Sequence, residues 1–368
     1  MIIGVPKEIK THEYRVGIMP FGVEELKKDG HTILIETDAG EGSGFTDDEY
    51  LKADADIVDR ETVFKKADLL VKVKEPLPSE YDSIKNGQAI FTYLHLAPNR
   101  ELTELLLNKK VTALAYETLQ KDGNLPLLAP MSEIAGRIAP LMGAYYLQRI
   151  HGGSGILPTG ATGVKPANAL ILGAGNVGAN AARVCIGMDM DTVIMNRGME
   201  RLQRLDELFI GKIKTLPLTA HNIKEEIQKA DIIIGAVLVP GGKTPVLVTR
   251  DMLKTMKKGS VIVDVSVDQG GCVETTKPTT HDNPVYSVEG ILHYTVANMP
   301  GAYPRTSTLA LTNATLPYIK TIAKIGIRRA IMEDEAIKSA LNVYGGEIMH
   351  KAIADSLSLP YKDIAGIL

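Results

Sequence analysis

Short runs of valine, isoleucine and leucine alternate with segments of helical spacing along the first third of the chain. Short apolar runs are typical of buried strands, whereas apolar residues spaced three and four apart are typical of helices. The pattern predicts helices at 21–28, from about 47 onward and at 100–108, and strands at 1–5, 32–36, 67–74, 88–94 and 111–116. Alternating strands and helices of this kind favour a parallel sheet covered by helices.

The alternation returns after a glycine-rich segment at 152–163. The strands expected there are 168–172, 192–195, 231–237 and 260–267. Beyond Pro304 the pattern turns helical, with one helix at 306–325 interrupted by Pro317 and a second periodic stretch at 332–356. We expect no strand in this last part, because its apolar residues keep a helical period.

These patterns predict an α/β protein with two Rossmann-like domains, each a parallel sheet flanked by helices. The N-terminal domain is expected to be discontinuous and completed by the C-terminal helices, as residues 1–128 plus 305–368. Residues 129–304 form the second domain, which contains the glycine-rich turn described below. Since the first domain has no such turn, we expect it to bind the other substrate.

Composition narrows the range of partners. The 368 residues are 45% hydrophobic and 23% charged with a formal net charge of −3, which is typical of an ordinary globular protein of two domains. No basic run is interleaved with aromatic residues and no apolar run reaches the roughly 20 residues of a membrane span, so we expect neither a nucleic acid nor a membrane partner. The first residues predict a strand and lack the form of a signal peptide, which favours a cytoplasmic location. The two cysteines, Cys185 and Cys272, are too few for a disulfide framework or a structural zinc, and we expect no metal.

The glycine-rich turn follows the strand at 168–172 and opens a helix of small residues. Gly173 permits the tight turn, Gly175 lets a pyrophosphate approach the backbone, and Gly178 lets the helix pack closely on the strand. The N-terminal amides of the helix, beginning at Asn176 and Val177, would then face the phosphates. Because a strand precedes the motif and a helix follows it, the context predicts a dinucleotide site rather than a simple turn.

Four polar side chains are candidates for chemistry. Lys74, His95 and Asp268 each close a predicted strand, and ligands of open α/β sheets lie beyond the carboxyl ends of strands. Histidine suits proton transfer because its unperturbed pKa of about 6.5 lies near neutrality. Arg15, in the polar loop after the first strand, could clamp a carboxylate at two points. Each residue alone is more often a surface or structural group, so the prediction depends on their joint placement.

With these residues assembled, the chain resembles the alanine dehydrogenases of the alanine dehydrogenase/transhydrogenase alpha-subunit family over nearly its whole length. The stretches that carry the resemblance are 4–8, 13–16, 73–76, 94–98, 131–137, 264–272, 296–301 and 305–315. The family implies reversible NAD-dependent oxidative deamination of L-alanine to pyruvate and ammonia by a subunit that usually assembles as a homohexamer. It makes Arg15 and Lys74 the substrate anchors and His95 and Asp268 the catalytic pair, and which of the two carries each proton stays open.

The resemblance also assigns the cofactor-binding positions. Together with the glycine turn they are Ser132, Gly173, Gly175, Asn176, Val177, Gly178, Asn196, Arg197, Arg201, Val237, Leu238, Val265, Ser266, Val267, Asp268, Val296, Ala297, Asn298 and Met299. One of them departs from the family pattern, because Asn196 and then Arg197 stand where an aspartate usually closes the second strand. An aspartate repels a 2′-phosphate, whereas asparagine beside arginine could accept one, so NAD is the expected cofactor and NADP the alternative.

Three other functions fit the same architecture. A transhydrogenase-type subunit that binds nicotinamide nucleotides is the nearest, and a saccharopine-type dehydrogenase is more distant. A catalytically silent dinucleotide-binding protein would also share the fold, since fold alone does not define activity. The size limit of the amino-acid side chain and the oligomeric state are not determined by these patterns.

Overall fold

The structure is a computed structural model that describes residues 1–238 and 244–364. The chain folds into two compact units, Met1–Met131 with Gly301–Leu368 and Ser132–Pro300. These bounds differ by a few residues from the predicted divisions at 128 and 305. Across the two described stretches, no helix is both long and apolar enough to cross a membrane.

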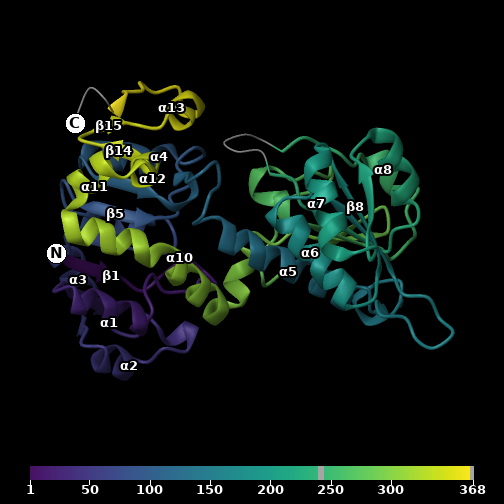
Figure 1. The fold of residues 1–368 in the computed structure, drawn as a ribbon, viewed down its shortest axis with the longest axis horizontal. Coiled ribbons are helices and arrows are strands. Elements are labelled where there is room, and N and C mark those ends of the chain that lie inside the picture. The colour runs from purple at the N-terminus through teal and green to yellow at the C-terminus, as the bar shows by residue number, and fades with distance from the viewer. Residues whose placement is uncertain (239–243, 365–368) are drawn as a thin grey trace. The chain divides into compact units, whose positions relative to one another are not determined.

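The first unit is built on an eight-stranded sheet (Figure 1). Its strands are β1 (Ile2–Val5), β2 (Thr32–Glu36), β3 (Asp56–Val58), β4 (Leu69–Val71), β5 (Ala89–Thr92), β6 (Thr112–Ala115), β14 (Leu341–Tyr344) and β15 (Glu347–Ile348). They lie in the order β15-β14-β6-β5-β4-β1-β2-β3. The pairs from β3 to β6 are all parallel, and β1 and β4 are neighbours although two strands separate them in sequence. This doubly wound order puts a switch point between β1 and β4.

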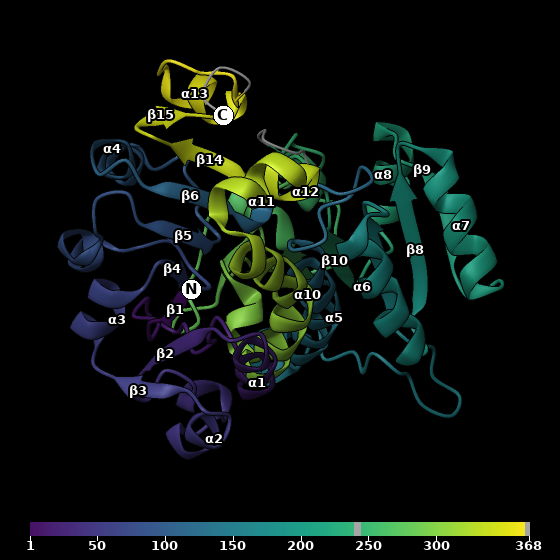
Figure 2. The same ribbon diagram turned by 60° about the vertical axis from the view of Figure 1, so that its left-hand side comes forward.

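Helices cover both faces of this sheet (Figure 2). They are α1 (Pro20–Lys28), α2 (Asp47–Lys52), α3 (Arg60–Lys66), α4 (Arg100–Asn108), α10 (Pro304–Ile325), α11 (Ile327–Glu333), α12 (Glu335–Ser339) and α13 (Lys351–Leu357). Helices α3, α4 and α13 share one apolar core with β4 to β6, and α1 packs against α10. Local signals start several of these helices, since Thr46 and Glu49 form a capping box and Asp59 and Asn99 cap the next two.

The C-terminal part corrects two sequence predictions. Helix α10 runs through Pro317 without interruption. Residues 341–348 form a hairpin, β14 and β15, and β14 pairs antiparallel with β6. Gly345 and Gly346 both adopt positive φ, at 61° and 91°, which is the turn that a Gly-Gly pair favours between two strands. The helical period misled the prediction because this hairpin is short and its partner β6 lies far away in sequence.

The second unit has a seven-stranded sheet in the order β12-β13-β11-β10-β7-β8-β9. Its strands are β7 (Asn168–Leu172), β8 (Asp191–Asn196), β9 (Lys214–Pro217), β10 (Ile232–Gly235), β11 (Val261–Asp264), β12 (Val285–Val288) and β13 (Ile291–Tyr294). Its helices are α5 (Ala129–Tyr146), α6 (Asn176–Gly187), α7 (Met199–Phe209), α8 (Ala220–Ile227) and α9 (Arg250–Leu253). Helix α5 begins just before the unit. All its pairs are parallel except β12 with β13, and its switch point lies between β7 and β10.

Alternation along the strands divides the apolar core of this unit into two layers. Leu170, Leu172 and Ile233 pack with α8 and α9 on one face. The neighbouring residues Ile171 and Ile232 point to the other face, where Ile171 lies beside the start of α6 and Ile232 meets α5 at Gly143. The predicted α/β class, with two sheets flanked by helices, is confirmed. The first unit is discontinuous, and its C-terminal part adds the strands β14 and β15 as well as the expected helices.

Candidate active site

In the first unit, three of the predicted side chains leave the carboxyl edge of one sheet. Arg15 lies in the loop after β1, Lys74 follows β4 and His95 follows β5. Strands β1, β4 and β5 are consecutive neighbours, and the first two flank the switch point. Ligands of doubly wound sheets bind at such an edge, and the structure brings these three of the four predicted residues to it.

Arg15 is buried, with 1% of its surface exposed, and its guanidinium is held on one side by Glu13. Nε donates to Oε1 at 2.6 Å and Nη2 donates to Oε2 at 2.5 Å, which makes a two-point pair. Nη1 lies 3.0 Å from the sulfur of Met131. Glu13 engages the Nε–Nη2 edge of the planar fork, and this two-point pair fixes the orientation of the guanidinium.

Lys74 is half-buried close to Arg15. Burial and, secondly, the positive charge of Arg15 lower the pKa of its ammonium below the ordinary value of 10.5. Within the part of the chain that the structure describes, no carboxylate lies within ion-pair distance of its Nζ. Two positive groups at a partly dry edge favour an anionic ligand, since an anion would relieve their mutual repulsion.

A buried ion cluster underlies Lys74. The ammonium of Lys72 is fully buried and lies 2.9 Å from Glu80 and 3.3 Å from Glu8. Glu8 Oε1 also accepts the backbone N–H groups of Val73 and Lys74, at 2.6 and 3.3 Å. Burial raises the pKa of Glu8, against the lowering effect of Lys72. This cluster ties the loop after β1 to the segment after β4, which fixes the backbone that carries Lys74.

His95 is exposed and has a left-handed backbone, with φ at 48°. Its N–H donates to Glu117 Oε1 at 2.7 Å. Its ring stacks on that of Tyr93, with centroids 6.1 Å apart and planes 14° apart. The hydroxyl of Tyr93 donates to the carbonyl of Leu127 at 2.6 Å, so a buried and anchored ring supports the imidazole.

In the second unit, the glycine-rich turn has the steric reasons that its sequence predicted. Gly173 adopts φ of 114°, and a Cβ there would overlap the carbonyl oxygen of Ala236. A Cβ at Gly178 would overlap the carbonyl oxygen of Gly173, so α6 starts in close contact with the turn. At Gly175 the space is open, and the nearest atom to a Cβ would be Nη1 of Arg201 at 3.6 Å. The turn therefore leaves room at the position where a phosphate would approach, beside a positive side chain.

Asn196 ends β8 next to this turn. Its Oδ1 accepts the N–H of Ala174 at 3.2 Å, and its Nδ2 donates to the carbonyl of Gly198 at 2.9 Å. Arg197 and Arg201 are exposed nearby along the chain. The strand end is therefore neutral, and its amide is engaged with the backbone on both sides.

The segment after β11 contains Asp268. Strand β11 ends at Asp264, and Asp268 lies exposed in the 3-10 turn η5 (Val265–Gln269) rather than in the strand. Asp264 is fully buried and its Oδ2 accepts the N–H of Cys272 at 2.8 Å and the hydroxyl of Thr276 at 2.7 Å, so it serves the local structure. Burial and the adjacent Asp264 raise the pKa of the Cys272 thiol, which argues against a nucleophilic cysteine.

The remaining predicted cofactor positions also lie in the second unit. The hydroxyl of Ser266 donates to the carbonyl of Val237 at 2.8 Å, which joins the ends of β10 and β11. The side chains of Val267, Val296 and Met299 are buried, whereas Ser132, Val237, Val265, Ala297 and Asn298 are partly accessible and Leu238 is exposed. At the buried positions only the backbone could contact a ligand in this structure.

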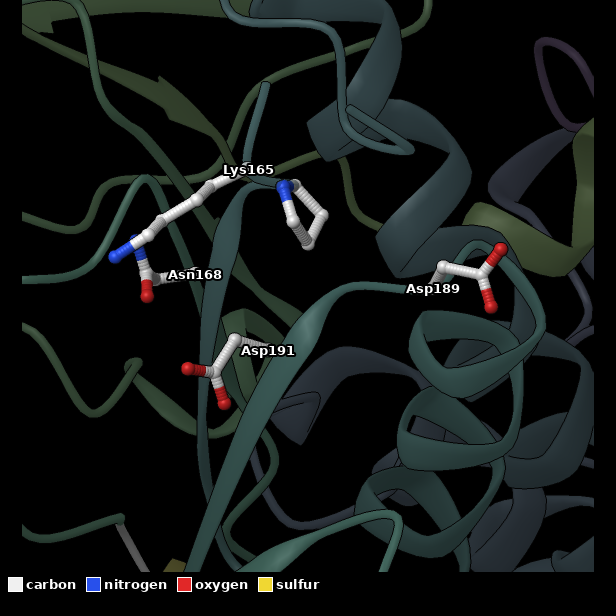
Figure 3. A pocket seen from close by; sticks show the side chains of 5 residues that line it. Lys165, Asn168, Asp189 and Asp191 are labelled. Carbon is white, nitrogen blue, oxygen red and sulfur yellow. The ribbon is translucent and has the colours of Figure 1, made fainter. Parts of the chain in front are cut away.

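A hollow of about 320 Å³ opens at the other end of the same sheet (Figure 3). It is lined by Lys165, Pro166, Asn168, Asp189 and Asp191, and in Figure 3 these side chains come from the segments that enter β7 and β8. This is the amino end of the strands, opposite the glycine turn. Doubly wound sheets bind their ligands at the carboxyl end, so the hollow is not the candidate site.

Sequence reasoning missed the carboxylates that hold the candidate residues. Glu8, Glu13 and Glu117 each contact the backbone or side chain of Lys74, Arg15 or His95. Glu8 and Glu13 lie within stretches that carried the family resemblance, so a signal existed for them. Glu117 had no such signal, because only the pairing of β5 with β6 brings it to His95.

The chain contains two doubly wound units, and one of them has the glycine turn. It is therefore a two-domain α/β protein. Residues 4–135 match the N-terminal domain of the alanine dehydrogenase/PNT family, and residues 139–351 match its C-terminal domain. The chain belongs to this family.

Within this family, the chain is similar to alanine dehydrogenases and, at lower identity, to a transhydrogenase. The chain is 49% identical over 366 residues to alanine dehydrogenase 2 of Staphylococcus aureus (strain USA300), covering 99% of this chain and 98% of that protein. Its structure is similar to that of an L-alanine dehydrogenase, with a TM-score of 0.94, 47% identity and coverage of 97% of this chain and 99% of that one. A transhydrogenase from Sinorhizobium meliloti is also similar, with a TM-score of 0.82, 26% identity and coverage of 96% and 100%.

Proposed function

We propose that this protein is an oxidoreductase that catalyses the reversible NAD-dependent oxidative deamination of L-alanine to pyruvate and ammonia. The observation that carries this proposal is its similarity to alanine dehydrogenases across both units, at 47–49% identity. The first unit is the substrate domain and the second the dinucleotide domain. The substrate domain comprises residues 1–128 plus 305–368, and the dinucleotide domain comprises residues 129–304.

Arg15 and Lys74 bind the carboxylate of the substrate. Holding this group still orients the α-carbon hydrogen, and such positioning contributes several kcal/mol to a reaction of this kind. The burial of Arg15 and its two-point pair with Glu13 support the role, because the fork cannot turn away from the site. The lowered pKa of Lys74 supports it as well, because a carboxylate would restore the favourable environment that the lysine lacks.

The residues of the second unit fit a nicotinamide dinucleotide. The open space at Gly175 and the amides that begin α6 suit a pyrophosphate, and Arg201 is within reach of the same space. The bound cofactor supplies the hydride acceptor of the reaction. Ser132, Asn176, Val177, Val265, Ala297 and Asn298 are the other accessible positions of the proposed cofactor site.

His95 and Asp268 exchange the protons. Loss of hydride leaves an iminium that water must attack, and the resulting carbinolamine must then release ammonia, so a base and an acid are both needed. His95 is exposed at the sheet edge that carries Arg15 and Lys74, which supports its part. In its proposed role Asp268 orients the attacking water or accepts a proton from it.

NAD is the proposed cofactor, and NADP is the alternative that Asn196 raises. A neutral asparagine does not repel a 2′-phosphate, and Arg197 and Arg201 are exposed close by in the chain. Replacing Asn196 with aspartate should lower kcat/KM for NADP far more than for NAD. Initial rates with both cofactors measure this, and a wild-type enzyme that strongly prefers NADP would overturn the choice of NAD.

The decisive experiment follows the absorbance of reduced nicotinamide in both directions. L-alanine with NAD should produce NADH, and pyruvate with ammonia should consume it. Hydride transfer between two nicotinamide nucleotides without any amino acid would instead favour the transhydrogenase function that the 26% identical relative suggests. A protein that binds NAD but gives no rate in any of these assays would be a silent binding protein.

The enzyme is proposed to act as a cytoplasmic homohexamer. Three large apolar side chains of the second unit support association with further copies, because Ile150, Leu157 and Val164 are 83%, 61% and 65% exposed in one connecting stretch. Light scattering should give a mass near six times 39.8 kDa. A monomer at working concentrations would contradict this part of the proposal.

A further inference from the structure

Glu117 contacts the backbone of the proposed proton-transfer residue. Its Oε1 accepts the N–H of His95 at 2.7 Å, and both of its oxygens lie 3.2 Å from the N–H of Leu94. The contact is possible because β5 and β6 are parallel neighbours paired up to Thr92 and Ala115. Glu117 therefore leaves its strand beside the segment that leaves β5.

The conformation of His95 needs such a contact. A non-glycine residue with φ of 48° is in the left-handed region, which costs roughly 1–2 kcal/mol. Residues held in this region persist where the surrounding structure over-determines them. In the described part of the chain, the carboxylate of Glu117 is the acceptor for the His95 N–H, and the stacked ring of Tyr93 is the support for the imidazole.

We propose that Glu117 is a positioning residue, whose carboxylate holds the backbone of His95 in the left-handed conformation that presents the imidazole to the substrate. This rests on the proposed role of His95 in proton transfer. Glu117 itself touches no substrate in the proposal. Its contribution belongs to kcat rather than to carboxylate binding, because Arg15 and Lys74 are held by other carboxylates, Glu13 and Glu8.

The geometry also predicts which substitution preserves the function. A single oxygen, Oε1, lies within hydrogen-bond distance of both amides. Glutamine can place its carbonyl oxygen there and keep both bonds, with an unfavourable approach of its NH₂ group to the N–H of Leu94 as the main loss. Alanine removes the acceptor, and aspartate is too short to keep it without moving the backbone.

The test compares Glu117→Ala, Glu117→Asp and Glu117→Gln in the full-length enzyme. The first two should lower kcat by at least about tenfold, a part of what acid–base catalysis contributes, while KM for pyruvate stays within about threefold. Glu117→Gln should keep most of the activity. If the alanine variant does not fold, the aspartate variant decides, and an unchanged kcat in the folded variant overturns the proposal.

A double-mutant cycle separates positioning from general structural damage. Asparagine tolerates the left-handed region, so His95→Asn removes the imidazole with little change of backbone. If Glu117 acts through His95, then adding Glu117→Ala to His95→Asn should lower kcat no further. Effects that multiply would overturn the proposal. A normal kcat for His95→Asn alone would instead contradict the proposed function of His95.

Asp334 provides a matched control in the same unit. Its Oδ1 also accepts two successive backbone N–H groups, those of Ala336 and Ile337, at 2.8 and 3.0 Å. Asp334→Ala should lower the melting temperature and leave kcat unchanged. An equal loss of kcat in this variant would mean that the Glu117 effect reflects general destabilisation, and would overturn the proposal.

Discussion

Lys74 shows how a single residue can be placed where its own charge is disfavoured. Burial and the neighbouring Arg15 both lower the pKa of its ammonium. The fork of Arg15 is in turn paired with Glu13, so the two cations of the site differ in how they are compensated. A group whose charge is poorly compensated in the free protein gains most from a ligand of opposite charge.

This predicts a pH dependence of substrate binding. As the pH rises, Lys74 loses its proton below the ordinary value of 10.5, and the site loses half of its positive charge. KM for pyruvate, which has no amino group to titrate, should therefore increase with pH at saturating ammonia. The measurement is a series of initial rates at constant ionic strength.

Lys74→Arg is the control for that series. Guanidinium stays charged throughout the range, so KM of this variant should change much less with pH than that of the wild type. If the two series run in parallel, another group is responsible for the titration.

At the scale of elements, the start of α6 depends on a close contact between Gly178 and the backbone of the glycine turn, which leaves no space for a side chain. A Cβ at Gly178 would meet the carbonyl oxygen of Gly173, which belongs to the backbone and cannot swing aside. Gly187 ends the same helix, and a Cβ there has no atom within 4 Å. The two glycines therefore form a matched pair in one helix.

We expect opposite effects from alanine at these two positions. Gly178→Ala should destabilise the protein by about 1–3 kcal/mol, as overpacking commonly does, and should weaken NAD binding because the turn must shift. Gly187→Ala should be neutral or stabilise by up to about 1 kcal/mol, since alanine loses less conformational freedom in a helix. Urea unfolding and NAD titration measure both quantities. Equal effects of the two substitutions would contradict the steric argument.

At the scale of the whole molecule, histidines that are buried fully or in part link stability to pH. Burial lowers the pKa of His31, His293 and His350. A histidine with a lowered pKa in the folded state is protonated first in the unfolded chain. The contribution of such a histidine to the free energy of unfolding is fully present above about pH 6.5, the ordinary histidine pKa. It is lost as the pH drops toward the folded-state pKa, because the unfolded chain binds more protons in that range.

His293 allows this to be tested. It is fully buried between the hydroxyl of Thr275 and the carbonyl of Ile291, at 2.8 and 3.0 Å. His293→Gln removes one of these titrating groups, so its melting temperature should fall less than that of the wild type between pH 7 and pH 5. The difference is limited, because one group contributes at most about 1.4 kcal/mol per pH unit. The exposed His221 on α8 is the control, and His221→Gln should follow the wild type.

Local patterns in the sequence were sufficient for much of this fold. The alternation of apolar runs and helical spacing predicts most strands of both sheets, and the glycine turn predicts the junction of β7 and α6. These features depend on neighbouring residues alone, namely side-chain period and the space around a Cβ. The Gly345–Gly346 turn had the same kind of signal, although the helical period around it concealed the hairpin.

What only the tertiary structure decided are the contacts between segments distant in sequence. Glu117, which follows β6, accepts the N–H of His95, which follows the neighbouring strand β5. Glu8 accepts the N–H of Lys74 across the switch point, and β14 pairs with β6 although more than two hundred residues separate them. Hydrogen bonds and ion pairs of this kind leave no periodic trace in the chain, because their partners approach only after the sheet has formed. The sequence by itself therefore determined which residues could carry the chemistry, and the folded sheet decided what holds each of them.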